Sequence, residues 1–159
     1  MRDNVFVVEK AALRKGLISG WFGPMVITPR ALFFISLVEF NSNNIFSYPA
    51  IGRGAIGSAR KAREIIDKKT DQELRNLGDY LDRLDNLVLE KENSLKINHL
   101  DILWCKLPKR YYLQTGSPNL GVIYLKTIEK KYEILFEEPK KIYLGLREYL
   151  LNNLYPIKN

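Results

Sequence analysis

The sequence predicts a mainly β protein (α+β), with about seven antiparallel strands, an inserted helical hairpin and one helix at the end. Three observations predict this fold class. Runs of β-branched and aromatic residues occupy the first and last thirds of the chain. A helix-capping signal followed by regularly spaced leucines occupies the middle. The final segment carries its apolar residues at helical spacing.

Length and composition set the outer limits. The 159 residues, 46% hydrophobic and 27% charged, predict one domain over 1–159 that folds without a disulfide or a metal. The single cysteine, Cys105, indicates a reducing compartment. The apolar run 31–38 is shorter than the roughly twenty residues of a membrane-spanning helix, and residues 1–10 hold no signal-peptide core. We therefore expect a cytoplasmic protein, either free or peripheral to a membrane.

Strands are expected first at Val5–Val8, which is β-branched and aromatic. Residues Met25–Thr28 and Ala31–Val38 are apolar runs separated by Pro29 and Arg30, which is the pattern of a hairpin. The last third repeats the signal. The strands expected there are Leu95–Ile97, Ile102–Leu107, Val122–Thr127 and Tyr132–Phe136. His99 falls in the turn before the second of these.

The middle of the chain, 41–94, is expected to be a helical insertion after the third strand. Thr70 and Glu73 form a capping box. A narrow apolar stripe follows it, made of Leu74, Leu77, Leu81, Leu84 and Val88. The stripe fits core packing or a dimer seam, and core packing is favoured because the repeat is short.

Charge divides this insertion in two. Residues 50–69 carry a net +4 and residues 70–95 a net −4. The favoured interpretation is a helical hairpin with mutually attracting arms. The alternative is a basic helix on an anionic membrane surface.

A C-terminal helix is expected over 139–153. It opens at Pro139, which suits a first helical turn. Its apolar residues are Ile142, Leu146, Tyr149 and Leu150. Their spacing predicts one amphipathic face.

Catalytic groups are scarce. His99 is the only histidine, so a multi-histidine metal site is excluded, and a strand-like separation of about 20 Å argues against a pair with Cys105. Residues 52–57 spell G-x-G-x-x-G but follow a polar, proline-terminated segment instead of a buried strand. We expect no catalytic, cofactor or metal residues, and hence no enzyme.

A second function class rests on Lys109, Arg110, Tyr111 and Tyr112. In a nucleic-acid-binding protein, tyrosines stack on bases and cations contact phosphates. The favoured interpretation is a strand with solvated cations, because no known nucleic-acid-binding motif accompanies these residues. Nucleic-acid binding by the basic C-terminal half stays as the alternative function.

Three segments together resemble the pleckstrin-homology-like (PH-like) superfamily, in its prokaryotic and GRAM-type branch. Gly23–Phe34 is similar to a hairpin of that branch in which leucine and threonine are followed, about two residues later, by arginine, leucine, isoleucine and phenylalanine. Asn98–Ile102 is similar to the turn that opens its second sheet, and 120–153 to its last hairpin and closing helix. The resemblance implies a two-sheet PH-like barrel of near-orthogonal antiparallel sheets, capped at one end by the C-terminal helix 139–153. It also implies a scaffold for lipid headgroups, peptides or oligomer partners.

Lipid-binding members of this superfamily place bases around the first hairpin loop. The corresponding stretch, 10–16, contains Lys10, Arg14 and Lys15, the candidate contacts for anionic lipid or phosphate. Their spacing differs from that of the family, so we expect weak attraction to anionic surfaces. Trp21 and Phe22 could insert at such a surface, although a core position is favoured. The expected function is a non-catalytic PH-like binding module for a protein partner, a second copy of the chain or a membrane surface.

The net charge of +7 fits this expectation only broadly. The two halves of the insertion cancel, and the excess is spread over the expected strands and loops. A charge of this size indicates solubility and weak attraction to anions, and names no ligand.

Overall fold

The computed structural model describes residues 5–16, 19–40, 64, 68, 71–72, 75, 82–107, 120–137, 144–149 and 157–158. These residues form a mainly β fold with few helices. The strands are β1 (Phe6–Gly16), β2 (Ser19–Ile27), β3 (Ala31–Phe34), β4 (Val38–Phe40), β5 (Leu95–Asn98), β6 (Ile102–Lys106), β7 (Leu120–Thr127), β8 (Lys131–Glu137) and β9 (Ile157–Lys158). Helix α3 (Leu84–Glu90) precedes β5, and the 3-10 turn η2 (His99–Asp101) joins β5 to β6.

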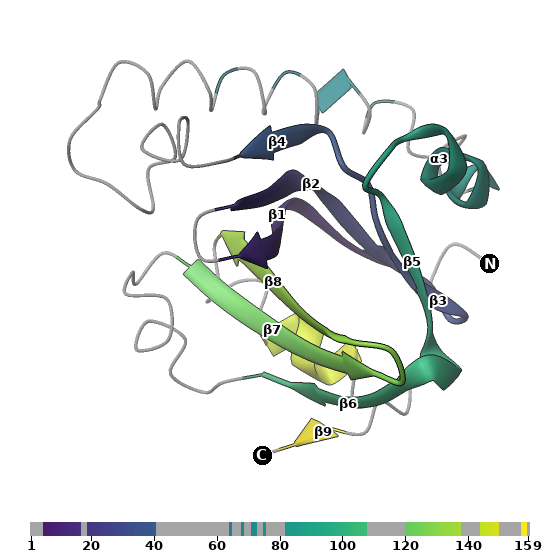
Figure 1. The fold of residues 1–159 in the computed structure, drawn as a ribbon, viewed down its shortest axis with the longest axis vertical. Helices are drawn as coiled ribbons and strands as arrows, with labels where there is room; N and C mark the ends of the chain where they lie inside the picture. The colour runs from purple at the N-terminus through teal and green to yellow at the C-terminus, as the bar shows by residue number, and fades with distance from the viewer. Residues whose placement is uncertain are drawn as a thin grey trace.

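The strands belong to one curled sheet with the order β5-β3-β2-β1-β8-β7-β6-β9, and β4 also pairs with β2. β5 and β6 are consecutive in the chain, yet one begins this order and the other lies near its end. The sheet must therefore bend until its two sides meet at η2, and Figure 1 shows the strands arranged around a common interior. The sheet is not closed, because the order ends at β5 on one side and at β9 on the other.

The expected count of about seven strands is confirmed, and the expected pairing needs one correction. Seven strands have four or more residues, while β4 and β9 are short additions to the expected set. Pairing is antiparallel throughout the described sheet except at β9, which runs parallel to β6. The parallel pair arises because the chain returns to β6 from a distant part of the sequence, which no local pattern encodes.

The expected hairpin of Met25–Thr28 and Ala31–Val38 is confirmed in its first half. β2 and β3 pair in antiparallel register, with Val26 opposite Phe33. The Thr28 hydroxyl accepts a hydrogen bond from the backbone N–H of Ala31 at 3.2 Å and fixes the turn.

The expectation of one strand through 31–38 is wrong. Pairing stops at Phe34 and resumes as β4. Between them, the N–H of Ile35 donates to the oxygen of Pro24 at 3.0 Å, and the N–H of Leu37 donates to that of Phe22 at 2.9 Å. These bonds keep the chain against β2 while it bends, so the apolar run contributes to two short strands.

The first strand is longer than expected. β1 continues from Phe6 to Gly16, so the stretch 10–16 is strand and not hairpin loop. The register shifts between Val8 and Ala11, which is the sign of a bulge or irregularity. The mixed polar and small residues of this stretch hid the strand, because they break the alternation that marks one.

The main core fills the interior of the curled sheet. Its largest fully buried side chains include Phe34, Phe136, Met25 and Ile123, which come from four different strands. Leu146 joins the same cluster at 0% exposure, and residues 144–149 are helical. Interior packing is therefore shared by the sheet and by this helical turn.

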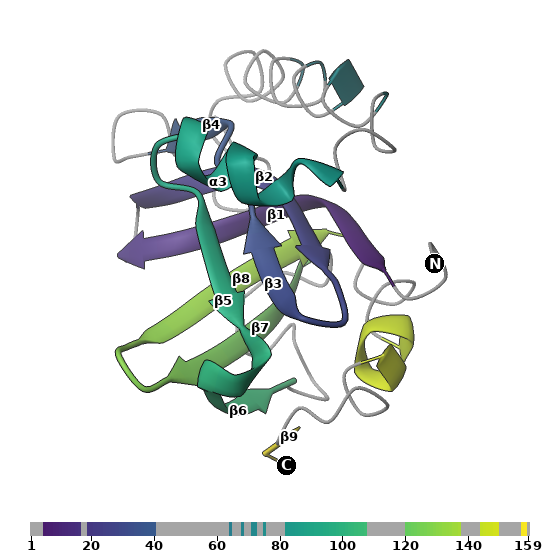
Figure 2. The same ribbon diagram turned by 90° about the vertical axis from the view of Figure 1, so that its right-hand side faces the viewer.

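Residues 144–149 lie at one end of the sheet. The Tyr149 hydroxyl donates to the backbone oxygen of Ile27 at 3.4 Å, and its ring lies 5.7 Å from that of Phe6. Figure 2 shows this helical turn, in yellow, beside the hairpin of β2 and β3.

Helix α3 covers part of the outer face of the sheet. Leu84 and Leu87 are buried against Val26, Phe33 and Ile35. Core packing is thus confirmed for the part of the leucine stripe that the structure describes. β4 ends at Phe40 and β5 begins at Leu95, so the segment 41–94 follows the fourth strand and not the third, and a helical insertion over the whole of it stays a prediction. The glycine-rich segment 52–57 lies outside the described residues. The predicted attraction between the +4 and −4 halves also depends on residues outside them.

Candidate functional site

The three candidate lipid contacts of β1 do not form one cluster. Arg14 lies on the same face of β1 as Ala12, which packs in an outer cluster, whereas Leu13 points into the main core. The register shifts again between Arg14 and Gly16, so regular alternation does not extend to Lys15. The contacts of the two cations nevertheless differ, because Arg14 bonds to Glu133 and Lys15 lies over the ring of Trp21. Lys10 sits at the register shift and is half-buried. The continuation of β1 through these residues and its two register shifts, which the sequence did not predict, separate the three cations.

Arg14 is held by an acid on the neighbouring strand. Its Nη1 lies 2.8 Å from Oε1 of Glu133 on β8, and both side chains are largely covered, at 24% and 31% exposure. Tyr124 lies close by. Desolvation raises the pKa of its hydroxyl, the charge of Glu133 raises it further, and that of Arg14 lowers it. Arg14 therefore has a structural role on β1 that competes with lipid contact.

Replacing Arg14 by glutamine should destabilise the protein by about 1 kcal/mol, because Glu133 would keep a partly covered charge without its partner. Urea denaturation at low salt measures this. The matched control is Arg83→Gln, which removes an exposed pair with Glu90 at 3.5 Å and should change stability by less than about 0.5 kcal/mol. Equal effects of the two substitutions would contradict the assignment.

Lys15 is exposed and its ammonium lies 5.7 Å from the ring centroid of Trp21. Trp21 packs against the main core, and its indole Nε1 is buried without a hydrogen-bond partner. Phe22 is 5% exposed. The favoured core position is therefore confirmed for Phe22, and Trp21 is partly buried against the main core. Lys15 remains available as a weak anion contact.

The candidate nucleic-acid contacts Lys109, Arg110, Tyr111 and Tyr112 lie outside the described residues. The other residues considered for chemistry are placed. His99 lies in η2, in a turn before a strand as expected, and its Nε2 is 2.6 Å from the backbone oxygen of Thr28. Cys105 is fully buried in β6, as expected of a lone cysteine among apolar residues.

Burial raises the pKa of the Cys105 thiol from 9.0 to about 12. The native state therefore keeps the proton between pH 9 and 12, where the unfolded chain releases it. The thiol therefore leaves the free energy of unfolding unchanged below pH 9. Above pH 9 it should lower that free energy by about 1.4 kcal/mol for each pH unit. The measurement is the difference in unfolding free energy between the wild type and Cys105→Ala at pH 8 and 10. A difference that does not change with pH would contradict this prediction.

A recess of about 260 Å³ opens where β5, η2 and the turn between β7 and β8 meet. It is lined by Lys96, Ile97, Asp101, Thr127, Ile128, Glu129 and Tyr132. Lys96 lines the recess, whereas Lys130 lies on the β7–β8 turn beside it. Lys96 Nζ lies 2.6 Å from Oδ1 of Asp85 on α3, and Lys130 Nζ lies 4.9 Å from the ring centroid of Tyr132.

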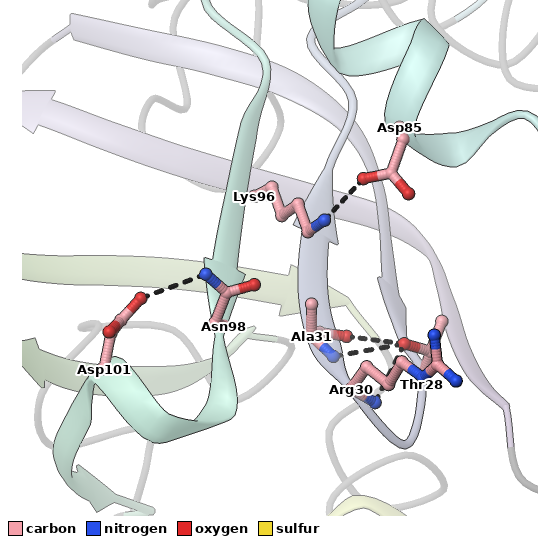
Figure 3. Close-up of polar contacts among 7 residues, drawn as sticks. All are labelled: Thr28, Arg30, Ala31, Asp85, Lys96, Asn98 and Asp101. Carbon is pink, nitrogen blue, oxygen red and sulfur yellow. Dashed lines mark hydrogen bonds and ion pairs between the residues drawn. The ribbon is translucent and has the colours of Figure 1, made fainter.

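The turns around this recess are fixed by hydrogen bonds. Figure 3 shows Asn98 donating to the carboxylate of Asp101 at 3.1 Å, and Thr28 bonded to the backbone of Arg30 and Ala31. The oxygen of Arg30 accepts from the N–H of His99 at 3.1 Å, which ties the β2–β3 turn to η2.

The oxygen of Asp101 accepts from the N–H of Ile128 at 3.3 Å, which ties η2 to the β7–β8 turn. We call residues 28–30, 99–101 and 128–130 the turn end of the sheet. Two aliphatic side chains project from it: Leu100 is 96% exposed and Ile128 is 69% exposed. No sequence pattern described above marks either residue. The signal that could have found them is a large aliphatic residue in each of two polar turns, where small and polar residues are usual.

Side chains that could carry chemistry lie apart from one another among the described residues. Within them, no group of three or more histidine, cysteine, aspartate or glutamate side chains could hold a metal ion. His99 is engaged with a backbone oxygen, and the thiol of Cys105 is inaccessible. None of the described helices is both long enough and apolar enough to cross a membrane.

The chain matches no protein-family model, no curated protein and no solved structure.

Proposed function

We propose that the protein is a non-catalytic, PH-like binding module that associates with a membrane surface or a protein partner. The observation that carries the proposal is the strand arrangement. Strands β1, β2, β3 and β5 form one side of the curled sheet, and β6, β7 and β8 form the other, joined by η2 and by the pairing of β1 with β8. A PH-like barrel has this order of strands.

The end of the chain supports the same proposal. Residues 144–149 follow the last long strand, β8, and bury Leu146 in the interior of the sheet. In a PH-like barrel, a C-terminal helix after the last strand caps one end of the interior. With one end covered in this way, the turns at other points of the sheet are free to present ligand contacts.

Three measurements on the full chain test this function. They are co-sedimentation with vesicles of a polar lipid extract, sedimentation equilibrium for self-association, and a titration with single-stranded and duplex DNA. Vesicle binding or a defined oligomer would support the proposal. Binding to DNA alone, or no association in any of the three, would overturn it.

A further inference from the structure

We infer that the turn end docks on an anionic lipid bilayer, with Leu100 and Ile128 entering the interface and nearby lysines contacting the headgroups. The inference rests on the proposed function and names the surface on which that function would act. Four observations carry it: the exposure of two aliphatic residues, the rigidity of the turns that hold them, the charge around them and the small size of the apolar area.

Leu100 and Ile128 are two of five exposed large hydrophobic residues in the described part of the chain, and what sets this pair apart is that they lie on adjoining turns. Leu100 and Ile128 lie on different turns, η2 and the β7–β8 turn, which a hydrogen bond joins at Asp101. Both views of the fold place these turns at the same end of the sheet (Figures 1 and 2). Neither side chain contributes to a described core cluster. Leaving two large aliphatic side chains in water gains nothing for folding, so an external apolar phase is the natural site for them.

The turns are fixed before any ligand arrives. In the β7–β8 turn, the N–H of Thr127 donates to the oxygen of Lys130 at 2.9 Å, and the Thr127 hydroxyl accepts from the N–H of Lys130 at 3.2 Å. His99 and Asn98 hold η2 through their bonds to the neighbouring turn and to Asp101. A pre-formed turn loses little conformational entropy on binding, so two aliphatic side chains can suffice for a measurable affinity.

The charge around the two aliphatic residues favours an anionic surface. Lys126 and Lys131 stand opposite one another in register across β7 and β8. Like charges in this position repel, and an anion placed between or above them relieves the repulsion. The exposed cations Lys130 and Arg30 lie on the turns themselves. Within the turn end, Arg30 and Lys130 balance the acids Asp101 and Glu129, so the excess positive charge next to it comes from Lys126 and Lys131.

The small size of the exposed apolar area favours a bilayer over a protein partner as the binding surface. A stable protein interface buries about 800 Å² on each side and is centred on aromatic or arginine residues in packed pockets. Two separate aliphatic side chains surrounded by cations do not provide such a centre. They do match the requirements of an interface between headgroups and acyl chains, where apolar groups enter and lysines reach anionic headgroups.

The test uses the full chain and vesicles of phosphatidylcholine with 30% phosphatidylserine, at low salt, with pure phosphatidylcholine vesicles as the neutral comparison. We expect binding to the anionic vesicles that weakens as salt is raised. The double variant Leu100→Asn with Ile128→Asn should bind at least about tenfold more weakly. The matched control is Leu89→Asn with Leu144→Asn, which removes two exposed leucines, 85% and 69% exposed, from other elements and should leave binding unchanged.

The charge is tested in the same way. Neutralising Lys130 and Lys131 with glutamine should weaken binding by about fivefold for each lysine. Neutralising Lys68 and Lys106, which are equally exposed but lie on other elements, should have no such effect. Equal losses from both pairs would show adsorption by net charge alone and would overturn the assignment of a docking surface.

Insertion has its own readout. An environment-sensitive fluorophore attached at Leu100→Cys should shift to the blue on binding anionic vesicles, and one at Leu89→Cys should not. The buried Cys105 thiol leaves the native cysteine unlabelled. Vesicle binding without a shift at position 100 would overturn the inference and leave the binding module intact. Failure of the wild type to bind anionic vesicles would also overturn it, and the proposed function would then depend on self-association alone.

Discussion

Replacing Gly23 by alanine is expected to destabilise the protein by about 3 kcal/mol or more. We expect no larger effect from adding one methyl group at any other glycine of the described sheet. A Cβ at position 23 would lie 1.7 Å from the backbone oxygen of Ile35 and 2.9 Å from its carbonyl carbon. Both atoms are backbone, and the hydrogen bonds of Ile35 and Leu37 to β2 hold them in place. The chain between β3 and β4 would have to move away and lose these bonds. Urea denaturation followed by tryptophan fluorescence measures the loss.

Gly145→Ala is the matched control for this substitution. The added Cβ would lie 3.4 Å from the ring of Phe6, an ordinary contact with a side chain. The position is helical, where alanine is favoured over glycine by about 0.5–1 kcal/mol. We therefore expect a small stabilisation from Gly145→Ala. Similar urea midpoints for the two variants would mean that β2 and the segment 35–37 are not closely packed.

The role of Gly23 illustrates which parts of the fold the sequence could predict. The hairpin of β2 and β3 could be predicted, because its apolar runs and its turn are adjacent in the chain. The break at 35–37 could not, because it depends on the approach of that segment to Gly23, and the apolar pattern continues through it. Likewise the pairing of β6 with β9 joins residues about fifty positions apart, for which no local signal exists.

The candidate site shows the same division. Lys10, Arg14 and Lys15 were chosen because they are close in sequence, yet strand alternation directs Arg14 to Glu133, 119 residues away. Leu100 and Ile128 are the reverse case. They are distant in sequence, and the pairing of β6 with β7 and the hydrogen bond between η2 and the β7–β8 turn bring their turns together. Residue type could have singled out each of them, but their joint surface depends on the tertiary structure.

Replacing Leu146 by alanine is expected to cost about 2–5 kcal/mol of unfolding free energy, because the side chain is fully buried and its removal leaves a cavity in the main core. Leu146 shares that core with residues of seven strands, so the loss should appear as a single cooperative transition at a lower urea concentration. The midpoint would move without a change in slope. This measurement shows whether residues 144–149 belong to the same folding unit as the sheet.

Leu144→Ala provides the comparison within the same helical turn. Leu144 is 69% exposed, so the substitution keeps the helix propensity nearly the same and removes little buried area. Its effect should stay within about 0.5 kcal/mol. If Leu146→Ala had an equally small effect, the helical turn would be an attachment to a self-sufficient sheet. A large difference between the two leucines would mean that the sheet depends on this turn to complete its core, as the PH-like proposal requires.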